Sequence, residues 1–504
     1  MPESSALWGG ELYFEGKPMG FFYWFIFLMT VAIFIFAIQN STAPTVAMKF
    51  LIWRFDASLI YTFLGSIGAG ILMAFIFWIP RAIKVSIQSK ELKKRIENLE
   101  KVLYGPAAPE EAQTQRVMKK AIVIPVYLRF NQPEELPHLE ELRLAKRAIE
   151  SLKILEDQDF TLILLVCFDS TGGEEEVSLL EMDRFVRKEV HNLWEGKTIL
   201  FSSHHLKMLR RNLDQRDFRG FSSLTDLKGF SKIRNVGLLL AQALSVDVAI
   251  FIDNDEVLEA PRYLKVACEY LNERWNGKVV AGKGGFYVNP DGTILLPPRR
   301  LWWDFLWNKT KWMNRVWERI LSSKDRLVFS PILLGGNLVL HCDLFRSVPF
   351  DPYIPRGEDI DYLINASQFG LSLLFDRELQ IKHLHPERSE AFFQEELRGD
   401  IERFLYEREK VKRGLCVDLN PYPGYFLRWT LYPRAILTSL FLSLNYLGKR
   451  EWKKAKECLS CVRLLFKKRD GDGLNYLKFR ADWERVMVEV QRNWMVEILK
   501  SCWV

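Results

Sequence analysis

The sequence predicts an α/β domain built around a mostly parallel sheet, with a pair of membrane-spanning helices before it and a helical region after it. Two long uncharged stretches precede residue 80, and each has about the length of a helix that crosses a bilayer. Further along, short apolar runs alternate with helical patterns, which is typical of strand-helix-strand units with parallel strands. The expected parts are a two-span domain ending in a short amphipathic or coiled-coil helix (1–104), a linker (105–117), the α/β domain (118–410) and the helical region (411–504).

Composition narrows the class of protein. The chain has 504 residues and a formal net charge of only +7, so nothing in it calls for a nucleic-acid partner. It contains 16 Trp and 35 Phe, a generous number for a soluble protein, and this favours contact with a lipid bilayer. The seven cysteines are odd in number and thinly spread, which indicates free thiols in a reducing compartment. Cys458 and Cys461 are the one close pair, and no second pair supports a zinc site.

The first two helices are predicted from length and charge. Phe21–Ile38 is a stretch of 18 residues without a charge, and Leu59–Ile79 is another of 21. Basic residues cluster after the second stretch, so that flank should face the cytoplasm. Both termini and everything beyond residue 80 are then cytoplasmic, and Gln39–Ser58 lies outside.

This N-terminal part resembles a known family. The run F-I-F-A-I-Q-N at Phe34–Asn40 is followed by a polar, β-prone loop, a glycine-containing second span and a charged helical tail. Together they resemble the lipopolysaccharide assembly protein A-like membrane domain over residues 21–103. The resemblance implies an envelope setting, a multi-pass protein of a bacterial-type inner (cytoplasmic) membrane, and no chemistry. In the tail, apolar residues step by four, three and four from Leu92 to Leu103, which fits either a short coiled coil or a single amphipathic helix.

The stretch with the clearest chemical signal is V-D-V-A-I-F-I-D-N-D-E. Val248–Ile252 is a short apolar run of the kind found in a central, doubly buried strand, and it ends at Asp253-Asn254-Asp255. Ligands of open α/β sheets bind outside the carboxyl ends of the strands. If the backbone stays extended, both Asp side chains point to the same side, which suits a hard divalent cation. The alternative is a simple turn, because Asp and Asn also end strands for backbone reasons.

Two further strands and two helices complete the central pattern. Ala121–Pro125 and Thr161–Phe168 are apolar strands, separated by a helix over residues 138–155, and Asp169 closes the second strand. Residues 171–230 show no clear pattern and are treated as an insertion. A second helix, Ser231–Leu244, runs directly into the D-N-D strand.

The first turn of that second helix carries basic residues. Lys232 and Arg234 lie there against the helix dipole, which favours anions at a helix N-terminus. A bound phosphate would resolve the conflict, and a solvated basic turn is the alternative.

The order of these parts resembles the GT-A fold, a Rossmann-like fold of sugar-nucleotide-dependent glycosyltransferases, and is most similar to the inverting family 2 pattern. The segments that carry the resemblance are I-V-I-P-V-Y (122–127), Asp169, K-I-R-N-V-G-L (232–238), Asp253-Asn254-Asp255, Gly335-Gly336-Asn337 after an apolar strand, and R-G-E-D-I-D (356–361). The usual D-G-S run of the family is D-S-T-G-G here. The resemblance implies that a nucleoside-diphosphate sugar is bound by Pro125, Tyr127, Asp169, Lys232, Arg234, Asn254, Gly335, Gly336 and Asn337.

The same resemblance assigns the chemistry. Asp253 and Asp255 would hold Mn²⁺ or Mg²⁺, which stabilises the charge growing on the departing diphosphate. The acceptor hydroxyl needs a base within hydrogen-bond reach. Asp359 is the first candidate and Glu358 the second, although either could instead stabilise the first turn of the helix that follows.

His383 and His385 alternate, so on an extended segment both face the same way. Several GT-A enzymes, including retaining ones that act on small acceptors, resemble this chain by completing the metal site with a late His. One of the pair is then a metal ligand, with His385 the first choice, and imidazole beside carboxylates favours manganese. Inversion and retention both stay open, and the motifs favour inversion.

Two other regions bear on the membrane. The basic aromatic stretch from Arg299 to Trp312 fits a membrane surface, a sugar site or a set of core contacts equally well. Residues 433–504 are expected to be cytoplasmic helices, with membrane-surface association as one option. Within them Ala435–Leu447 is too short for a third span. Arg428-Trp429 weakly resembles a motif of processive synthases, but Tyr425 replaces its Gln.

The sequence therefore predicts a membrane-anchored, metal-dependent hexosyltransferase whose acceptor is a lipid-linked or other envelope glycan. The alternatives are an inactive scaffold that binds sugar nucleotide, and a retaining transferase for a small soluble acceptor. A sugar nucleotidyltransferase would need a glycine-rich loop near the first strand, which is missing there. The oligomeric state stays open, with a homodimer as one option.

Overall fold

The computed structural model describes residues 45–50, 53–58, 118–130, 138–170, 176–297, 306–384, 393–412, 418–467 and 472–504. The chain divides into two compact units, Met1–Arg116 and Val117–Val504. In the first unit, β1 (Thr45–Phe50) and β2 (Trp53–Ser58) form an antiparallel pair.

Both predicted spans lie outside the described residues. Within the described part of the chain, no helix is both long enough and apolar enough to cross a bilayer.

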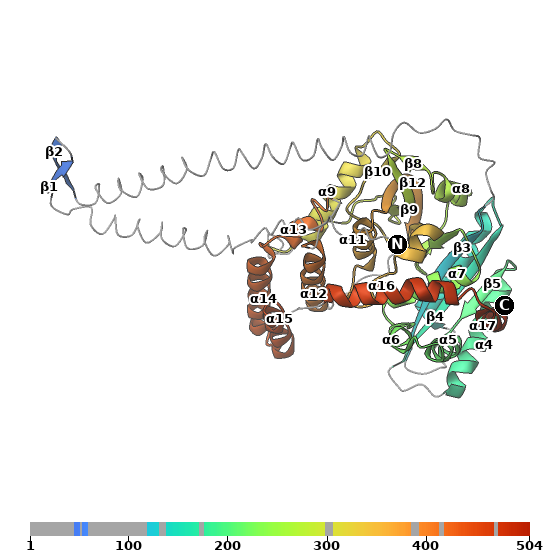
Figure 1. Ribbon diagram of the computed structural model, residues 1–504. Helices are drawn as coiled ribbons and strands as arrows, with labels where there is room; N and C mark the ends of the chain where they lie inside the picture. The colour runs from blue at the N-terminus through green and yellow to red at the C-terminus, as the bar shows by residue number, and fades with distance from the viewer. Residues whose placement is uncertain are drawn as a thin grey trace, which may run out of the picture. The chain divides into compact units, whose positions relative to one another are not determined.

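The second unit is built on a mixed sheet (Figure 1). Its strands are β3 (Lys120–Phe130), β4 (Phe160–Ser170), β5 (Thr198–Phe201), β6 (Val248–Phe251), β7 (Glu256–Val257), β8 (Arg274–Trp275), β9 (Lys278–Val288), β10 (Leu327–Val328), β11 (Leu338–His341) and β12 (Ser372–His383). The main order is β10-β12-β9-β11-β6-β3-β4-β5, with β7 beside β12 and β8 beside β9. Strands β6, β3 and β4 are parallel as predicted, and β5 adds a further parallel strand, whereas β11 runs antiparallel to both its neighbours.

The central strands are apolar without interruption because both faces of the sheet are covered. Along β3, Val123 belongs to one buried cluster and Ile122 to the other, as the two-residue period of a strand requires. On the neighbouring β6, Phe251 and Ile250 divide in the same way. Two cores therefore sandwich the sheet, and polar side chains gather where the strands end.

Helices cover the two faces unequally. The first face carries α3 (Glu140–Ser151), α4 (Glu176–Leu193) and α8 (Tyr263–Cys268). The second face carries α5 (Ser203–Asp214), α6 (Arg219–Ser222), α7 (Phe230–Ala243), α9 (Lys309–Leu321), α10 (Cys342–Ser347) and α11 (Glu358–Gln368). The supposed insertion at 171–230 thus supplies the edge strand β5 and helices on both faces, so it is part of the fold.

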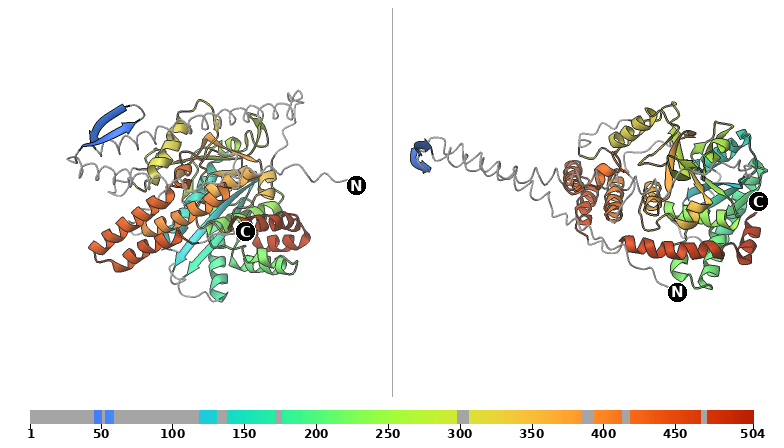
Figure 2. Two further views of the ribbon diagram at one scale, coloured as in Figure 1. Left: turned by 60° about the vertical axis from the view of Figure 1, so that its left-hand side comes forward. Right: turned by 45° about the horizontal axis from the view of Figure 1, so that its top comes forward.

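The C-terminal helices also belong to this unit. They are α12 (Phe393–Val411), α13 (Gly424–Leu427), α14 (Leu431–Gly448), α15 (Trp452–Leu464), α16 (Asp472–Glu489) and α17 (Asn493–Cys502). Helices α14 and α15 lie side by side as a hairpin (Figure 2). Helix α16 returns to the second face, where Trp483 Nε1 donates a hydrogen bond to the Phe345 carbonyl at 2.8 Å. After α17, the Val504 amide donates to the Thr198 carbonyl of β5 at 3.1 Å.

Candidate functional site

The D-N-D segment forms a turn at the carboxyl end of β6. The Glu256 amide donates to the Asp253 carbonyl at 3.1 Å, and the Asp253 amide donates to Glu256 Oε2 at 2.8 Å. Because these two bonds close the backbone on itself, the segment adopts the turn, the alternative to the extended backbone that the sequence left open. As a result the two Asp side chains meet different partners, Arg234 for Asp253 and His383 for Asp255.

Arg234 links three elements of the site. Its Nη2 lies 3.1 Å from Asp253 Oδ1, and its Nε lies 3.2 Å from Glu358 Oε1 in the first turn of α11. Burial by itself would lower the pKa of Arg234, but the two carboxylates raise it above its ordinary value, so the guanidinium stays charged. Its Nη1 is buried and has no hydrogen-bond partner among the described residues. A buried, charged donor without a partner at a strand end is suited to bind an anion.

Gly335 and Gly336 allow the backbone to approach this charge cluster closely. A Cβ on Gly335 would lie 2.3 Å from Arg234 Nη2, and one on Gly336 would lie 2.3 Å from Glu256 Oε2. No side chain fits at either position. Contrary to the prediction, this segment precedes an apolar strand, β11, and does not follow one. Asn337 is fully buried. Its side-chain Nδ2 donates a hydrogen bond to the Phe286 carbonyl, and its Oδ1 accepts one from the Tyr263 hydroxyl.

Asp255, Glu256 and His383 form a group that could hold a metal ion. One ligand atom from each lies within 4.8 Å of the others, and His383 Nε2 is 3.1 Å from Asp255 Oδ2. The arrangement comes from the sheet, since His383 lies opposite Glu256 in the β7–β12 ladder. His385, the first choice from the sequence, lies outside the described residues.

The members of this group differ in accessibility. Glu256 is fully buried, and burial followed by the charges of Asp253 and Asp255 raises its pKa well above the ordinary value. Asp255 and His383 stay partly exposed. A carboxylate with an imidazole is a donor set that fits Mn²⁺. The sequence did not single out Glu256, although its place directly after D-N-D was the available signal.

Helix α11 presents the two acids expected on the acceptor side. It starts after Gly357, which has a left-handed φ of 71° and packs against Arg403, so a Cβ there would lie 2.2 Å from the Arg403 Cζ. Glu358 is buried and bound by Arg234. Asp359 is half-buried, and its Oδ1 accepts from the Ile360 amide at 2.8 Å. Burial and then the Glu358 charge raise the pKa of Asp359 to about 6. The geometry therefore allows Asp359 both roles, base and first-turn acceptor.

A buried ion network fixes α11 against α12. Lys410 Nζ lies 2.7 Å from Asp361 Oδ1 and 2.5 Å from Asp351 Oδ2, and all three side chains are buried. The Tyr406 hydroxyl donates to Asp351 at 2.7 Å. Because each charge has a partner, the network holds the helix that carries Glu358 and Asp359 in one position.

The remaining predicted donor residues lie at varying distances from this cluster. Tyr127 is near it: burial, then Cys167 and Asp253, raise the Tyr127 pKa well above its ordinary value. Pro125 is buried within β3. Lys232 is half-buried in the first turn of α7, and Asn254 Nδ2 makes only a long contact of 3.5 Å to the Glu141 carbonyl. Asp169 is the penultimate residue of β4, and its side chain lies outside the described part.

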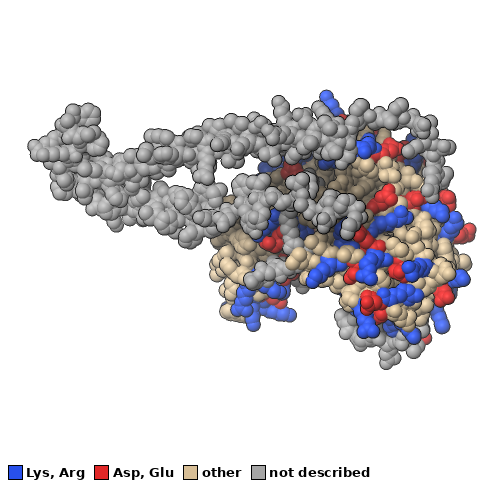
Figure 3. All heavy atoms as spheres, viewed as in Figure 1, with Lys and Arg blue, Asp and Glu red and all other residues tan. Residues whose placement is uncertain are grey.

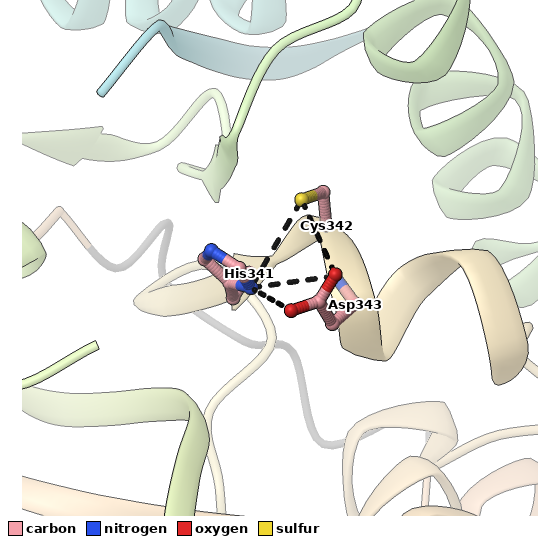
Figure 4. A group of neighbouring side chains, drawn as sticks. All are labelled: His341, Cys342 and Asp343. Carbon is pink, nitrogen blue, oxygen red and sulfur yellow. Dashed lines mark hydrogen bonds and ion pairs between the residues drawn. The ribbon is translucent and has the colours of Figure 1, made fainter. Parts of the chain in front are cut away.

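A second group with metal-binding side chains is His341, Cys342 and Asp343 (Figure 4). His341 precedes α10, and its Nδ1 accepts from the Asp343 amide at 3.3 Å. Burial raises the pKa of the Cys342 thiol, which disfavours the thiolate that binds metals. The contacts of this group are explained by capping of a short helix.

The basic aromatic stretch is described only from residue 306 onward. There Trp307 is buried and packs 5.1 Å from the Phe426 ring, which supports the core alternative for that residue. Trp312 stacks on Tyr425 at 3.8 Å.

Residues 39–103 match the lipopolysaccharide assembly protein A domain, so the resemblance predicted for 21–103 is confirmed over most of its length. The match supports membrane association of the N-terminal part. No curated protein matches the chain.

Solved structures match this chain at low sequence identity, and three of them are the following. A mannosyltransferase from Pyrobaculum calidifontis, in complex with GDP-Man and Mn²⁺, is 12% identical, with a TM-score of 0.39 over 83% of this chain and 99% of that one. A glucosyl-3-phosphoglycerate synthase from Mycobacterium tuberculosis, in complex with Mn²⁺ and UDP-glucose, is 16% identical, with a TM-score of 0.31 over 57% and 79%. Mouse xyloside xylosyltransferase 1 is 12% identical, with a TM-score of 0.25 over 52% and 78%. At these identities and TM-scores, the likeness carries no conclusion about the function or substrate of this chain.

Proposed function

We propose that the second unit is a metal-dependent glycosyltransferase that moves a hexose from a nucleoside-diphosphate sugar to a hydroxyl acceptor. One observation carries the proposal. The Arg234 guanidinium is bound to Asp253 and Glu358 at the end of β6. The turn that carries Asp253 also brings Asp255 beside His383. A fixed cation and a set of metal ligands at one strand end are the groups that a diphosphate leaving group requires.

The donor side follows from these contacts. Arg234 Nη1, buried and without a partner in the described chain, would bind an oxygen of the diphosphate. Lys232 lies two residues earlier, in the first turn of α7. Asp255 and His383 would hold the cation, with Glu256 behind them. Bound there, a divalent ion supplies Lewis-acid stabilisation of the departing diphosphate. The glycine backbone at 335–336 leaves no side chain between the sugar and these charges.

The acceptor side depends on Asp359. Glu358 is engaged by Arg234, so Asp359 is the acid that remains to receive the acceptor proton. A pKa of about 6 leaves this carboxylate mostly ionised near neutral pH, as a base requires. Inversion at the sugar carbon is proposed, since a base on the acceptor side serves direct attack.

The setting suggests the acceptor. The match over residues 39–103 and the two uncharged stretches support a tether to the inner membrane with the second unit in the cytoplasm. A transferase held at that surface would meet lipid-linked or other envelope-glycan acceptors. A retaining enzyme for a small soluble acceptor is the second candidate. The chain resembles such enzymes in having a late His beside the acidic turn.

The test is a panel of UDP-, GDP- and ADP-sugars assayed for hydrolysis and transfer with Mn²⁺, with Mg²⁺ and after chelation. Lipid extracts and soluble acceptors are compared, and the anomer formed is read by NMR. Asp255→Asn should lose Mn²⁺-dependent turnover and should also weaken Mn²⁺ binding measured by paramagnetic resonance. Binding of sugar nucleotide without turnover under any condition would indicate a scaffold, and turnover with soluble acceptors alone would exclude the lipid-linked substrate.

A further inference from the structure

The α14–α15 hairpin leaves apolar side chains in water. On α14, Leu437, Leu440 and Leu444 follow a spacing of three and four, and Leu444 is 64% exposed. Along α15 and just past its end, large apolar residues recur every seven positions, about two helical turns. Trp452 and Phe466 are 70% and 74% exposed. Each helix therefore presents a row of exposed large apolar residues, which a soluble surface rarely does.

The hairpin, together with the three residues that flank it at each end, carries the basic surplus of the whole protein. Residues 428–467 contain nine Lys and Arg against two Glu, a net charge of +7, which equals the formal net charge of the full chain. The rest of the chain thus sums to zero. The exposed basic side chains of this segment are Arg428, Lys449, Arg450, Lys453, Lys456, Arg463 and Lys467. Blue side chains gather toward the lower end of this hairpin in Figure 3, whereas elsewhere on that view both signs are mixed.

The two features lie on adjacent arcs of α15. At 100° per residue, Trp452, Leu459 and Phe466 fall within about 40° of one another, and Lys456 and Arg463 border them within about a further 40°. An apolar stripe edged by Lys and Arg is the pattern of a helix that lies in the interface of a bilayer. Neither helix can cross the membrane, since no described helix meets the length and hydropathy that a span needs.

We propose that the α14–α15 hairpin rests on the surface of an anionic membrane, with its apolar rows inserted at the headgroup level and its basic residues on the lipid phosphates. The net charge favours lipid over a second copy of the chain as the partner of this surface. Two copies would bring together two segments 428–467, each with a net charge of +7, and these would repel one another. The membrane domain matched at residues 39–103 places such a surface within reach.

The test uses the full chain in proteoliposomes of phosphatidylethanolamine and phosphatidylglycerol. Phe466 or Leu444 is replaced by the photoreactive residue p-benzoylphenylalanine, and adducts are identified by mass spectrometry after illumination. Val488 of α16, which is 62% exposed, is the matched control position. Because the N-terminal domain keeps every variant at the membrane, adduct formation reports local contact and not overall attachment.

Lipid adducts at 444 and 466, well above those at 488, are expected. Lys456→Gln with Arg463→Gln should lower the adduct at 466 by about fivefold or more, since each basic residue near an anionic surface contributes about that factor. Replacing phosphatidylglycerol by phosphatidylcholine should have the same effect. Adducts to a second copy or to the chain's own N-terminal part, yields no higher than at 488, or equal yields in neutral lipid would each overturn the proposal.

Discussion

Gly335→Ala is the sharpest perturbation of the proposed donor site. The new Cβ would lie 2.3 Å from Arg234 Nη2, whereas an unstrained contact needs about 3.5 Å, so a displacement of about 1.2 Å is required. Arg234 is held at 3.1 Å by Asp253 and 3.2 Å by Glu358 and cannot move without loosening both bonds. A misplacement of about 1 Å in a catalytic group lowers the rate about a hundredfold. That factor corresponds to about 2.7 kcal/mol of lost transition-state stabilisation.

The assay is kcat/KM for the donor found in the nucleotide panel, together with thermal unfolding of the same samples. Gly220→Ala is the control, because a Cβ at that position of α6 meets nothing within 4 Å. The control should keep full activity and be slightly more stable, as alanine favours a helix. If Gly335→Ala unfolds like the wild type and retains activity within about threefold, a positioning role for Arg234 in the transition state is refuted.

Three further predictions concern Arg234, Asp359 and the ion network that holds α11. Arg234→Lys keeps the charge but loses the planar fork that meets two carboxylates, so kcat/KM for the donor should fall at least about tenfold, as measured by initial rates. With Asp359 as the base, ionised above a pKa of about 6, kcat should rise with pH through about 6 and then level off, and Asp359→Asn should abolish the ionisation-dependent activity; a flat profile would exclude this role. Lys410→Met leaves Asp361 buried without its partner and should lower the free energy of unfolding by about 3–5 kcal/mol in denaturant titration, whereas Lys412→Met, at an exposed ion pair, should change it by at most about 1 kcal/mol.

The sequence was sufficient to locate the strand ends of the site, because that signal is local. An unbroken apolar run that stops at acidic residues marks a buried strand and its polar edge, and β6 with its D-N-D turn follows that pattern. The geometry of the turn was not predictable in the same way. It depends on the buried Glu256, whose carboxylate is tolerated only because Gly336, far along the chain, has no side chain.

Elements stabilised by distant partners were missed for a related reason. Strand β5 is only four residues long, and Trp503, just after α17, forms a β-bridge with its Ile199 from the end of the chain, so this pairing leaves no recognisable pattern in the sequence. Likewise, Lys410 lies in a charged helix that appears solvent-facing in sequence, and only the fold shows that it is buried against Asp351 and Asp361. Charges that pair across the fold carry no periodicity, so sequence patterns describe them as surface.

Helix α12 connects the two proposals physically. On one side it supplies Arg403 and Lys410, the residues that pack against Gly357 and bind Asp361 and so hold the acceptor-side helix α11. Helix α12 also packs against α15, the helix with the exposed apolar and basic rows. A membrane surface against α15 would therefore be separated from the candidate base by two packed helices, and the orientation of the hairpin on lipid would fix the direction from which an acceptor approaches Asp359. Contact with lipid and acceptor choice are then properties of one rigid arrangement, since packed helices of this kind transmit position with little compliance.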